Sequence, residues 1–250
     1  MIIKNTKQIE GIRRSCQLAA ECLREIERFL FLGQNTEQLN QIADDFIRKN
    51  KALPASLNYN GFPKSICTSI NNVVCHGIPS PTDLLNNGDI INIDVTVILD
   101  GFYGDTSKTF IIGEASEEVQ KFVQIAEKAL YAGIEVLKPT RKLSLMGKTI
   151  SKFVEKYGYS VVKEYGGHGV GLHFHEEPHV CHFYAPENNF LLKEGMIFTV
   201  EPMINQSKNW LVDTSIQDGW TVTTKDGSLS AQFEHTVLIT ATGHEILTLC

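Results

Sequence analysis

Acidic residues stand at positions where the sequence otherwise predicts buried β-strands. Asp94 interrupts a β-branched run, Glu201 ends an apolar run, Asp105 follows a predicted turn, and Glu234 lies in an alternating segment. A buried carboxylate is costly unless it is paired or binds a cation. Two carboxylates about 4 Å apart repel by on the order of 4 kcal/mol at an effective dielectric near 20. We therefore expect the four to converge on two divalent ions that share a bridging hydroxide. The alternative is unrelated acids at exposed strand ends.

A hairpin brings two of these carboxylates together. Residues 90–99 alternate in polarity, Asp100 and Gly101 form a two-residue turn, and the segment 102–112 returns as the second strand. This turn pairs Thr96 with Asp105. Asp94 shares a face with Thr96, so Asp94 and Asp105 are predicted to be diagonal neighbours.

Histidines gather in one segment of the chain. Five of the eight histidines lie between His168 and His182. Residues 175–179 match the HExxH pattern of zinc-protease helices, but Pro178 is incompatible with a regular helix there, so we reject that interpretation. His168 lies in the glycine-rich segment 165–171, which allows a close backbone approach and an imidazole ligand to a metal. The alternative is an ordinary surface histidine.

Amphipathic helices are predicted to support these segments. Asn5 and Gln8 form the pattern of a capping box at the start of the first helix. The expected helices cover 5–30, 36–49, about 117–137 and about 143–157. The remainder of the chain is predicted to form strands and polar loops.

An internal repeat suggests how the elements are organised. Residues 84–94 align without gaps with residues 191–201, and both segments carry two leucines, a glycine, an apolar run and a final carboxylate. We therefore expect one internally duplicated α/β domain with halves of approximately 1–112 and 113–250, each a helix pair followed by a strand pair. Chance similarity is the alternative.

The composition excludes several classes of protein. The chain has 250 residues, 42% of them hydrophobic, and a formal net charge of -6, so no nucleic-acid partner is expected. It contains no run of roughly 18 apolar residues that could span a membrane. Charged residues between Lys4 and Arg28 argue against a secretion signal, and six scattered cysteines without CxxC pairs favour free thiols. We expect a cytoplasmic protein.

Taken together, segments along nearly the whole chain resemble the type I methionine aminopeptidases. The segments are 61–71, 74–79, 92–96, 104–107, 167–171, 175–178, 199–203 and 230–235. The resemblance implies a pita-bread fold with pseudo-twofold symmetry and two divalent ions, of manganese, iron, cobalt or zinc. The ligands it implies are Asp94, Asp105, His168, Glu201 and Glu234. Among them Asp105 and Glu234 would bridge the ions, and Glu201 would also move a proton.

The same resemblance assigns residues that contact the substrate. His76 and His175 would contact the scissile amide. The methionine pocket would be formed by Tyr59, Phe62, Cys67, Phe174 and Trp220, for which plain core packing is the alternative. A monovalent cation would lie at Asn71, Val73 and Ser230.

The implied activity is removal of the initiator methionine from peptides and nascent proteins whose second residue is small. We expect a cytoplasmic monomer that works on chains emerging from ribosomes, with no membrane partner. Leu172 stands where type I enzymes usually carry arginine, and the segment 205–218 also departs from their pattern. The alternatives are an X-Pro aminopeptidase of the same fold and a non-enzymatic peptide-binding relative.

Overall fold

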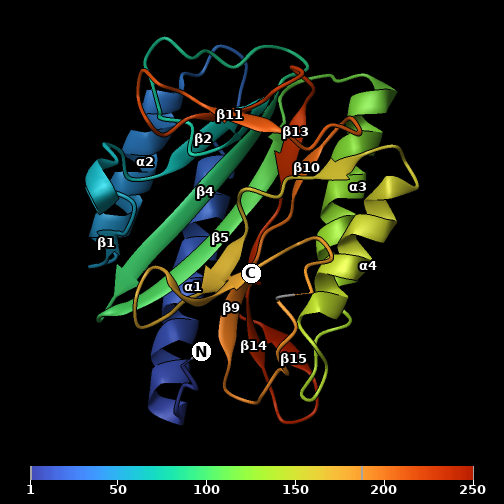
Figure 1. Cartoon of the computed structure of the whole chain (residues 1–250). Helices are drawn as coiled ribbons and strands as arrows, with labels where there is room; N and C mark the ends of the chain where they lie inside the picture. The colour runs from blue at the N-terminus through green and yellow to red at the C-terminus, as the bar shows by residue number, and fades with distance from the viewer. Residues whose placement is uncertain (1, 187, 250) are drawn as a thin grey trace.

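Two antiparallel sheets form the centre of the protein, and a pair of helices covers each of them (Figure 1). The computed structural model describes residues 2–186 and 188–249. The helices are α1 (Thr6–Glu27), α2 (Thr36–Lys49), α3 (Glu117–Ile134) and α4 (Ser144–Glu155), with a short 3-10 helix, η1 (Tyr59–Gly61). In Figure 1, α1 and α2 lie beside the first sheet and α3 and α4 beside the second.

The first large sheet is built around the long β4–β5 hairpin, and the second consists of five shorter strands. In the first, β4 pairs with β1, β2 and β5; the strands are β1 (Leu53–Pro54), β2 (Cys67–Ile70), β4 (Ile90–Leu99) and β5 (Phe102–Ile111). The second has the order β15-β14-β9-β7-β8, with β7 (Gly167–Gly169), β8 (Glu176–Val180), β9 (Ile197–Val200), β14 (His235–Ile239) and β15 (His244–Ile246).

Two smaller sheets close one end of the molecule. One has the order β13-β10-β6, with β6 (Ser160–Val161), β10 (Met203–Asn205) and β13 (Ser230–Gln232). The other has the order β11-β12-β3, with β3 (Val73–Cys75), β11 (Val212–Thr214) and β12 (Val222–Thr224).

The hairpin register predicted from the sequence is confirmed. Thr96 pairs with Asp105 across β4 and β5, and Asp94 pairs with Ser107. Side chains two residues apart on a strand share a face, so Asp94 and Asp105 point to the same side of the sheet.

The helix starts were predicted better than the helix ends. Asn5 and Gln8 form the expected capping box, with reciprocal bonds of 3.0 and 2.9 Å. However, α1, α3 and α4 end two or three residues earlier than predicted. At these ends the backbone tightens to i→i−3 hydrogen bonds, such as those of Phe29 with Ile26 and Leu137 with Ile134. The apolar pattern continues through such turns although the α-helix has ended.

The repeated segments occupy matching places in the two halves. Leu85 exchanges backbone hydrogen bonds of 2.8 and 2.9 Å with residues 33–34, directly before α2. Leu192 exchanges two such bonds, both of 2.9 Å, with residues 140–141, shortly before α4. After each leucine the chain turns at a glycine with positive φ, Gly88 or Gly195, and enters the strand that leads to a carboxylate. This recurrence agrees with the pseudo-twofold symmetry expected of the fold.

Separate apolar cores support the two large sheets. One fills the space between α1, α2 and the β4–β5 hairpin, and the other lies between α3, α4 and strands β9 and β14. A smaller cluster, which includes Ile12 of α1, Val170 and Leu238, joins α1 to the second sheet. The helices therefore fix the strands whose ends carry the acidic residues.

A seam of polar contacts joins the two sheets between β5 and β14. The Glu234 N–H donates to the Ser107 carbonyl at 2.9 Å, and the Thr106 hydroxyl donates to the Glu234 carbonyl at 2.8 Å. The Thr236 hydroxyl donates to the Asp105 carbonyl at 2.7 Å. These contacts place acidic residues of both sheets side by side.

Helix α1 lies unusually close to β5 beside this seam. A Cβ atom added to Gly104 would come within 2.2 Å of the Ser15 carbonyl carbon and 2.3 Å of the Cys16 nitrogen. Both are backbone atoms, which cannot rotate away as a side chain can. Gly104 therefore allows the helix to press directly on the strand that carries Asp105.

The cysteines follow the expectation where they can be assessed. The thiols of Cys16, Cys22, Cys67 and Cys75 are free and buried, whereas Cys250 is outside the described residues. Within residues 2–186 and 188–249, no helix combines the length and apolar character needed to cross a membrane.

Candidate active site

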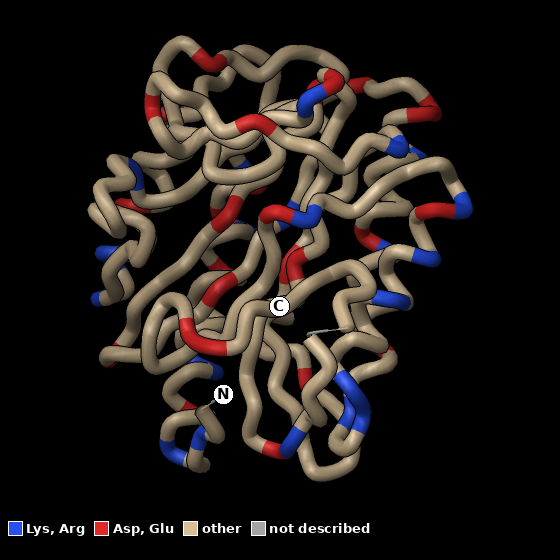
Figure 2. The backbone as a smooth tube through the Cα atoms, viewed as in Figure 1, with Lys and Arg blue, Asp and Glu red and all other residues tan. Residues whose placement is uncertain are grey.

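A cavity of about 390 Å³ opens between the two large sheets. Its lining includes the acidic residues of both sheets, three histidines of the predicted site and a set of aromatic side chains. Figure 2 shows acidic positions, in red, close together at the centre of the molecule between the two halves. The cavity is therefore the place where the residues singled out in the sequence meet.

Three carboxylates converge at the bottom of this cavity. One oxygen from each of Asp94, Asp105 and Glu234 lies within 4.8 Å of the other two. Asp94 and Asp105 come from the first sheet, whereas Glu234 precedes β14 in the second. The prediction that these acids meet is confirmed, and the interpretation as unrelated exposed acids is wrong.

Glu201 and His168 complete the cluster. The His168 Nε2 atom lies 3.7 Å from Asp105 Oδ2 and 3.7 Å from Glu201 Oε1. The Nδ1 atom of the same ring is 3.0 Å from the Gly169 carbonyl, which can only accept, so Nδ1 carries the hydrogen. This tautomer leaves the Nε2 lone pair directed among the carboxylates, as a metal-binding imidazole requires.

Burial makes the negative charge of this cluster expensive. It raises the pKa of Asp94 to about 7. Burial, reinforced by the neighbouring carboxylates, raises the pKa values of Asp105, Glu201 and Glu234 well above their ordinary range. Burial also lowers the pKa of His168 to about 3, so its imidazole is neutral near pH 7. The cluster needs positive charge or protons to persist.

Neighbouring polar groups orient the carboxylates. The Thr96 hydroxyl donates to Asp105 Oδ1 at 2.7 Å. The Thr199 hydroxyl donates to Glu201 Oε1 at 2.6 Å, and the Gln232 amide donates to Glu201 Oε2 at 3.0 Å. Such partners hold ligands in one orientation and leave their remaining lone pairs for a cation.

The donor set fits a divalent metal. Buried carboxylate oxygens and one neutral imidazole are ligands that manganese, iron, cobalt and zinc accept, whereas soft-metal thiolate sites would need cysteine. Cys67 lies in the cavity lining, but burial raises its pKa well above the ordinary value and keeps it a thiol. The residues present can therefore hold hard or borderline divalent ions.

Two further histidines stand at the wall of the cavity. His175 Nδ1 lies 2.9 Å from the Tyr59 hydroxyl, and its ring centre lies 4.1 Å from that of His168. His76 lies edge-on to Tyr165, with ring centres 5.5 Å apart. Burial, together with the nearby His175, lowers the pKa of His76 to about 4. Both rings are positioned to contact a group that enters the cavity.

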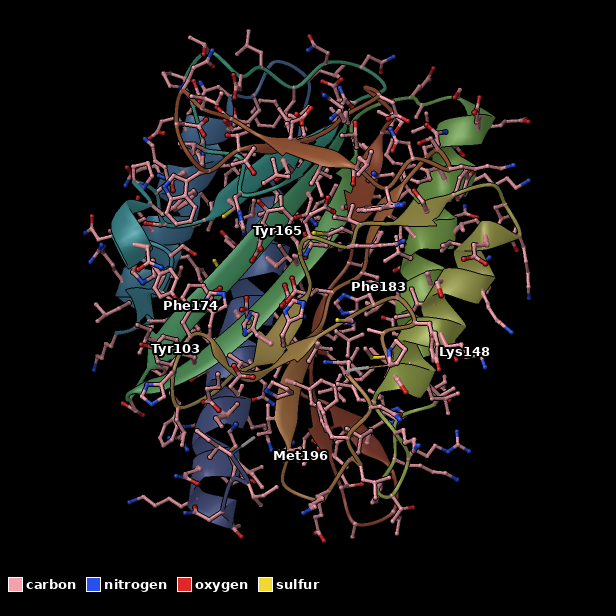
Figure 3. The ribbon with its side chains drawn as sticks, viewed as in Figure 1. Tyr103, Lys148, Tyr165, Phe174, Phe183 and Met196 are labelled. Carbon is pink, nitrogen blue, oxygen red and sulfur yellow. The ribbon has the colours of Figure 1, made fainter. Side chains whose placement is uncertain are left out.

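The aromatic residues predicted to bind a side chain line the same cavity. Tyr59 and Phe174 have ring centres 4.7 Å apart, and Phe62 meets Trp220 edge-on at 5.2 Å. In Figure 3, Phe174 lies close to Tyr103, with which it stacks at 6.1 Å. Cys67 pairs with Asp94 across β2 and β4, so it joins this apolar wall to the carboxylates.

Comparison with known proteins is decisive at this point. Residues 10–241 match the sequence model of Metallopeptidase family M24. The chain belongs to this family. It is 52% identical to a methionine aminopeptidase of Buchnera aphidicola and 50% identical to that of Escherichia coli K12, over 99% of this chain and 93% of each relative. A crystal structure of methionine aminopeptidase from Rickettsia prowazekii superposes with a TM-score of 0.97 at 49% identity and 100% coverage of both chains.

More distant relatives share the fold. The prolidase from Pyrococcus furiosus has a TM-score of 0.79 at 23% identity, and it covers 100% of this chain and 66% of its own. The mixed α/β architecture is thus the pita-bread fold expected from the sequence. The chain is a metallopeptidase, and the identities favour methionine aminopeptidases over the X-Pro enzymes.

The structure also places three other features of the sequence. The HExxH-like segment is not a helix, because Glu176–Val180 forms β8. Leu172 does not line the cavity; its backbone N–H donates to Glu176 Oε1 at 2.7 Å. The segment 205–218 contacts the pocket indirectly, because the Asp218 carboxylate accepts a hydrogen bond of 2.8 Å from the backbone N–H of Trp220.

The candidate monovalent-cation residues also lie away from the cavity. Asn71 and Ser230 are neighbours, because the Ser230 N–H donates to the Asn71 carbonyl at 2.9 Å. Val73 lies in β3, paired with Thr223. Among the described residues, Ser230 Oγ and Asn205 Oδ1 are buried without a hydrogen-bond partner.

Several residues that contact or support the site were not singled out in the sequence. Thr96, Thr199 and Gln232 each stand two positions from a carboxylate of the cluster on a strand-like segment, so strand periodicity could have indicated their role. His182 Nε2 accepts the Glu201 N–H at 2.9 Å. For His182 the sequence offered only its place in the histidine-rich segment.

Proposed function

We propose that this chain removes the N-terminal methionine from peptides and nascent proteins. The observation that carries the proposal is the direct junction of an apolar, aromatic pocket with a carboxylate–imidazole cluster in one cavity. Aromatic walls suit a methionine thioether, which gains sulfur–aromatic contact in addition to apolar burial. Relatives about 50% identical over nearly the whole chain are named methionine aminopeptidase, which supports the same activity.

We further infer that two divalent ions of manganese, iron, cobalt or zinc occupy the cluster. The proposed ligands are Asp94, Asp105, His168, Glu201 and Glu234. Asp105 and Glu234 would bridge the ions, which agrees with their place on the seam between the sheets. Divalent ions bound there would lower the pKa of water to roughly 7 and polarise a peptide carbonyl. The cost of burying several carboxylates supports the presence of two ions rather than none.

The protein's own groups then manage protons and orientation. Glu201 is held from both sides by Thr199 and Gln232, so one of its oxygens can take a proton from water and pass it to the leaving amine. When the Tyr59 hydroxyl donates to His175 Nδ1, the hydrogen of the imidazole is on Nε2, and His175 can donate it to the substrate. His76 and His175 are both neutral near pH 7, and each can donate a hydrogen bond to the scissile amide.

Further expectations belong to the same proposal. We expect the second residue of the substrate to be small. A monovalent cation at Asn71, Val73 and Ser230 is supported by the unpartnered Ser230 hydroxyl. We also infer a single domain with halves near 1–112 and 113–250. The protein would act as a cytoplasmic monomer on chains that leave the ribosome, without binding nucleic acid directly.

The test is metal-supplemented cleavage of Met-Ala, Met-Lys and Ala-Pro peptides, followed by mass spectrometry, each with and without a chelator. We expect chelator-sensitive loss of methionine from the Met-Ala peptide alone. Cleavage confined to the Ala-Pro peptide would assign the chain to X-Pro hydrolysis instead. No cleavage with any of the four metals would indicate a peptide-binding relative without activity.

A further inference from the structure

A second cavity, of about 500 Å³, lies beside the active site, between α4, β6 and the segment that precedes β11. Lysine and aromatic side chains are prominent in its lining. We call it the lysine–aromatic groove and define it by Lys163, Phe183, Tyr184, Lys208 and Trp210. The proposed activity makes no use of these residues.

The groove continues the walls of the active-site cavity. Lys163 lines the groove, and the next two residues, Glu164 and Tyr165, line the active-site cavity. A second segment also contributes to both cavities, because His179 lines the active-site cavity and Phe183, four residues later, lines the groove. In Figure 3, Phe183 lies between Tyr165 and Lys148 of α4. The two cavities are therefore neighbours that share two stretches of backbone.

Lys163 is held in place by aromatic rings. Its Nζ atom lies 4.2 Å from the centre of the Trp210 ring and 5.8 Å from that of Phe183. Lys163 and Lys208 are both exposed, and one acidic residue, Glu155, lines the groove with them. Such a surface can pair an ammonium group with a carboxylate while aromatic rings pack against an apolar side chain.

An exopeptidase that holds a substrate by its first residue must let the remaining chain leave the cavity. An extended chain advances about 3.3 Å per residue, so residues a few positions beyond the cut reach the neighbouring surface. We propose that the lysine–aromatic groove binds this downstream part of the substrate and favours acidic and aromatic side chains there. The inference rests on the proposed aminopeptidase activity and adds a specificity site beyond the residues that flank the cut.

The test uses the metal-supplemented enzyme and decapeptides that begin Met-Ala-Ser and continue with glycine and serine. One Asp-Phe pair is moved stepwise from the fourth to the ninth position, and kcat and KM are measured for each peptide. We expect one register to raise kcat/KM about threefold to fivefold, through KM, because an exposed ion pair contributes up to about 1 kcal/mol. Lys163→Glu should abolish this gain and favour a Lys-Phe pair instead, and Trp210→Ala should reduce the gain.

Two controls separate the groove from other causes. Lys49→Glu changes the net charge equally on exposed α2 and should leave the register preference intact. The tripeptide Met-Ala-Ser is too short to reach the groove, so its hydrolysis should be the same in all variants. If the unmodified protein does not cleave the tripeptide, the proposed aminopeptidase activity is refuted, and the inference that rests on it fails as well.

The groove proposal fails on its own if tripeptide cleavage is normal and no register is preferred. It also fails if Lys49→Glu and Lys163→Glu have the same effect, since that would be a net-charge effect. Lys163-dependent binding of a single-stranded RNA oligomer, without any register preference for peptides, would assign the groove to a nucleic acid and overturn the proposal.

Discussion

Lys4 and Glu176 form an ion pair that is buried on both sides. The Lys4 Nζ atom lies 2.6 Å from Glu176 Oε2, and the two side chains are 0% and 2% exposed. The other carboxylate oxygen, Oε1, accepts the backbone N–H groups of Leu172 and His173 at 2.7 and 3.1 Å. The N-terminal segment thereby fixes the loop that presents His175 to the cavity.

We predict that Lys4→Met destabilises the protein by about 3–5 kcal/mol, because it leaves the Glu176 carboxylate buried without its partner. Urea unfolding gives this loss directly. The Lys4→Met/Glu176→Gln double variant should recover part of it, since no buried charge remains. Lys7→Met removes an exposed lysine and should change stability by less than about 0.5 kcal/mol. Equal effects at Lys4 and Lys7 would contradict this account of the ion pair.

The metal-free protein should lose stability as the pH rises above neutrality. Its buried carboxyls have raised pKa values, about 7 for Asp94 and well above the ordinary range for its neighbours, so the folded state binds more protons than the unfolded state. Unfolding free energy then falls with pH, by about 1.4 kcal/mol per pH unit for each carboxyl still protonated in the folded state.

Other groups do not obscure this window. Burial lowers the pKa values of His168 and His182 to about 3, which makes stability rise with pH only below about 6.5. The buried thiols of Cys16 and Cys22, raised to about 12, matter only above about pH 8.5. Thermal unfolding in chelator between pH 7 and 8.5 should show a falling Tm, and added divalent metal should remove the fall. A flat Tm in chelator would count against the buried cluster.

Glu201→Gln should separate catalysis from folding. The amide is nearly isosteric but cannot accept a proton, so kcat should fall about 10²- to 10⁴-fold. The metal-free variant should be at least as stable as the unmodified protein, because one buried acid is gone. Glu164→Gln, an exposed change on the wall of the same cavity, is the matched control and should leave kcat within about threefold. A small kcat effect at Glu201 would remove it from the proposed proton transfer.

Gly104→Ala tests the close approach of α1 to β5. The added methyl group would overlap the Ser15 and Cys16 backbone, and overpacking of this kind costs typically about 1–3 kcal/mol. In a chain of this size the Tm should fall by about 2–12 °C. Gly243→Ala has no atom within 4 Å of the new methyl group and should have little effect. A fall in Tm no larger than that of Gly243→Ala would show that α1 can shift without cost.

Local rules predicted the elements that local interactions build. The capping box at Asn5 and the turn at Asp100 specify the start of α1 and the β4–β5 register through neighbours in the chain. The meeting of Asp94 with Glu234 depends instead on the seam between the sheets, which forms between residues more than a hundred positions apart. Charge cost suggested that the acids converge, but only the resemblance to a family supplied His168 as their partner.

Supporting contacts were harder to foresee for a related reason. His182 acts through a hydrogen bond from the Glu201 backbone, and the Lys4–Glu176 pair joins residues 172 positions apart in the sequence. Neither contact leaves a periodic pattern in the sequence. They follow from the way the second sheet folds over the N-terminal segment, which no local propensity encodes.

The cluster of acids straddles the seam between the two sheets. Asp94 and Asp105 come from one sheet, and Glu201 and Glu234 accompany the other. Neither sheet could assemble the full set alone, so the cluster forms only where the two sheets are joined at the seam. A fragment that contained one sheet alone would therefore lack part of the cluster.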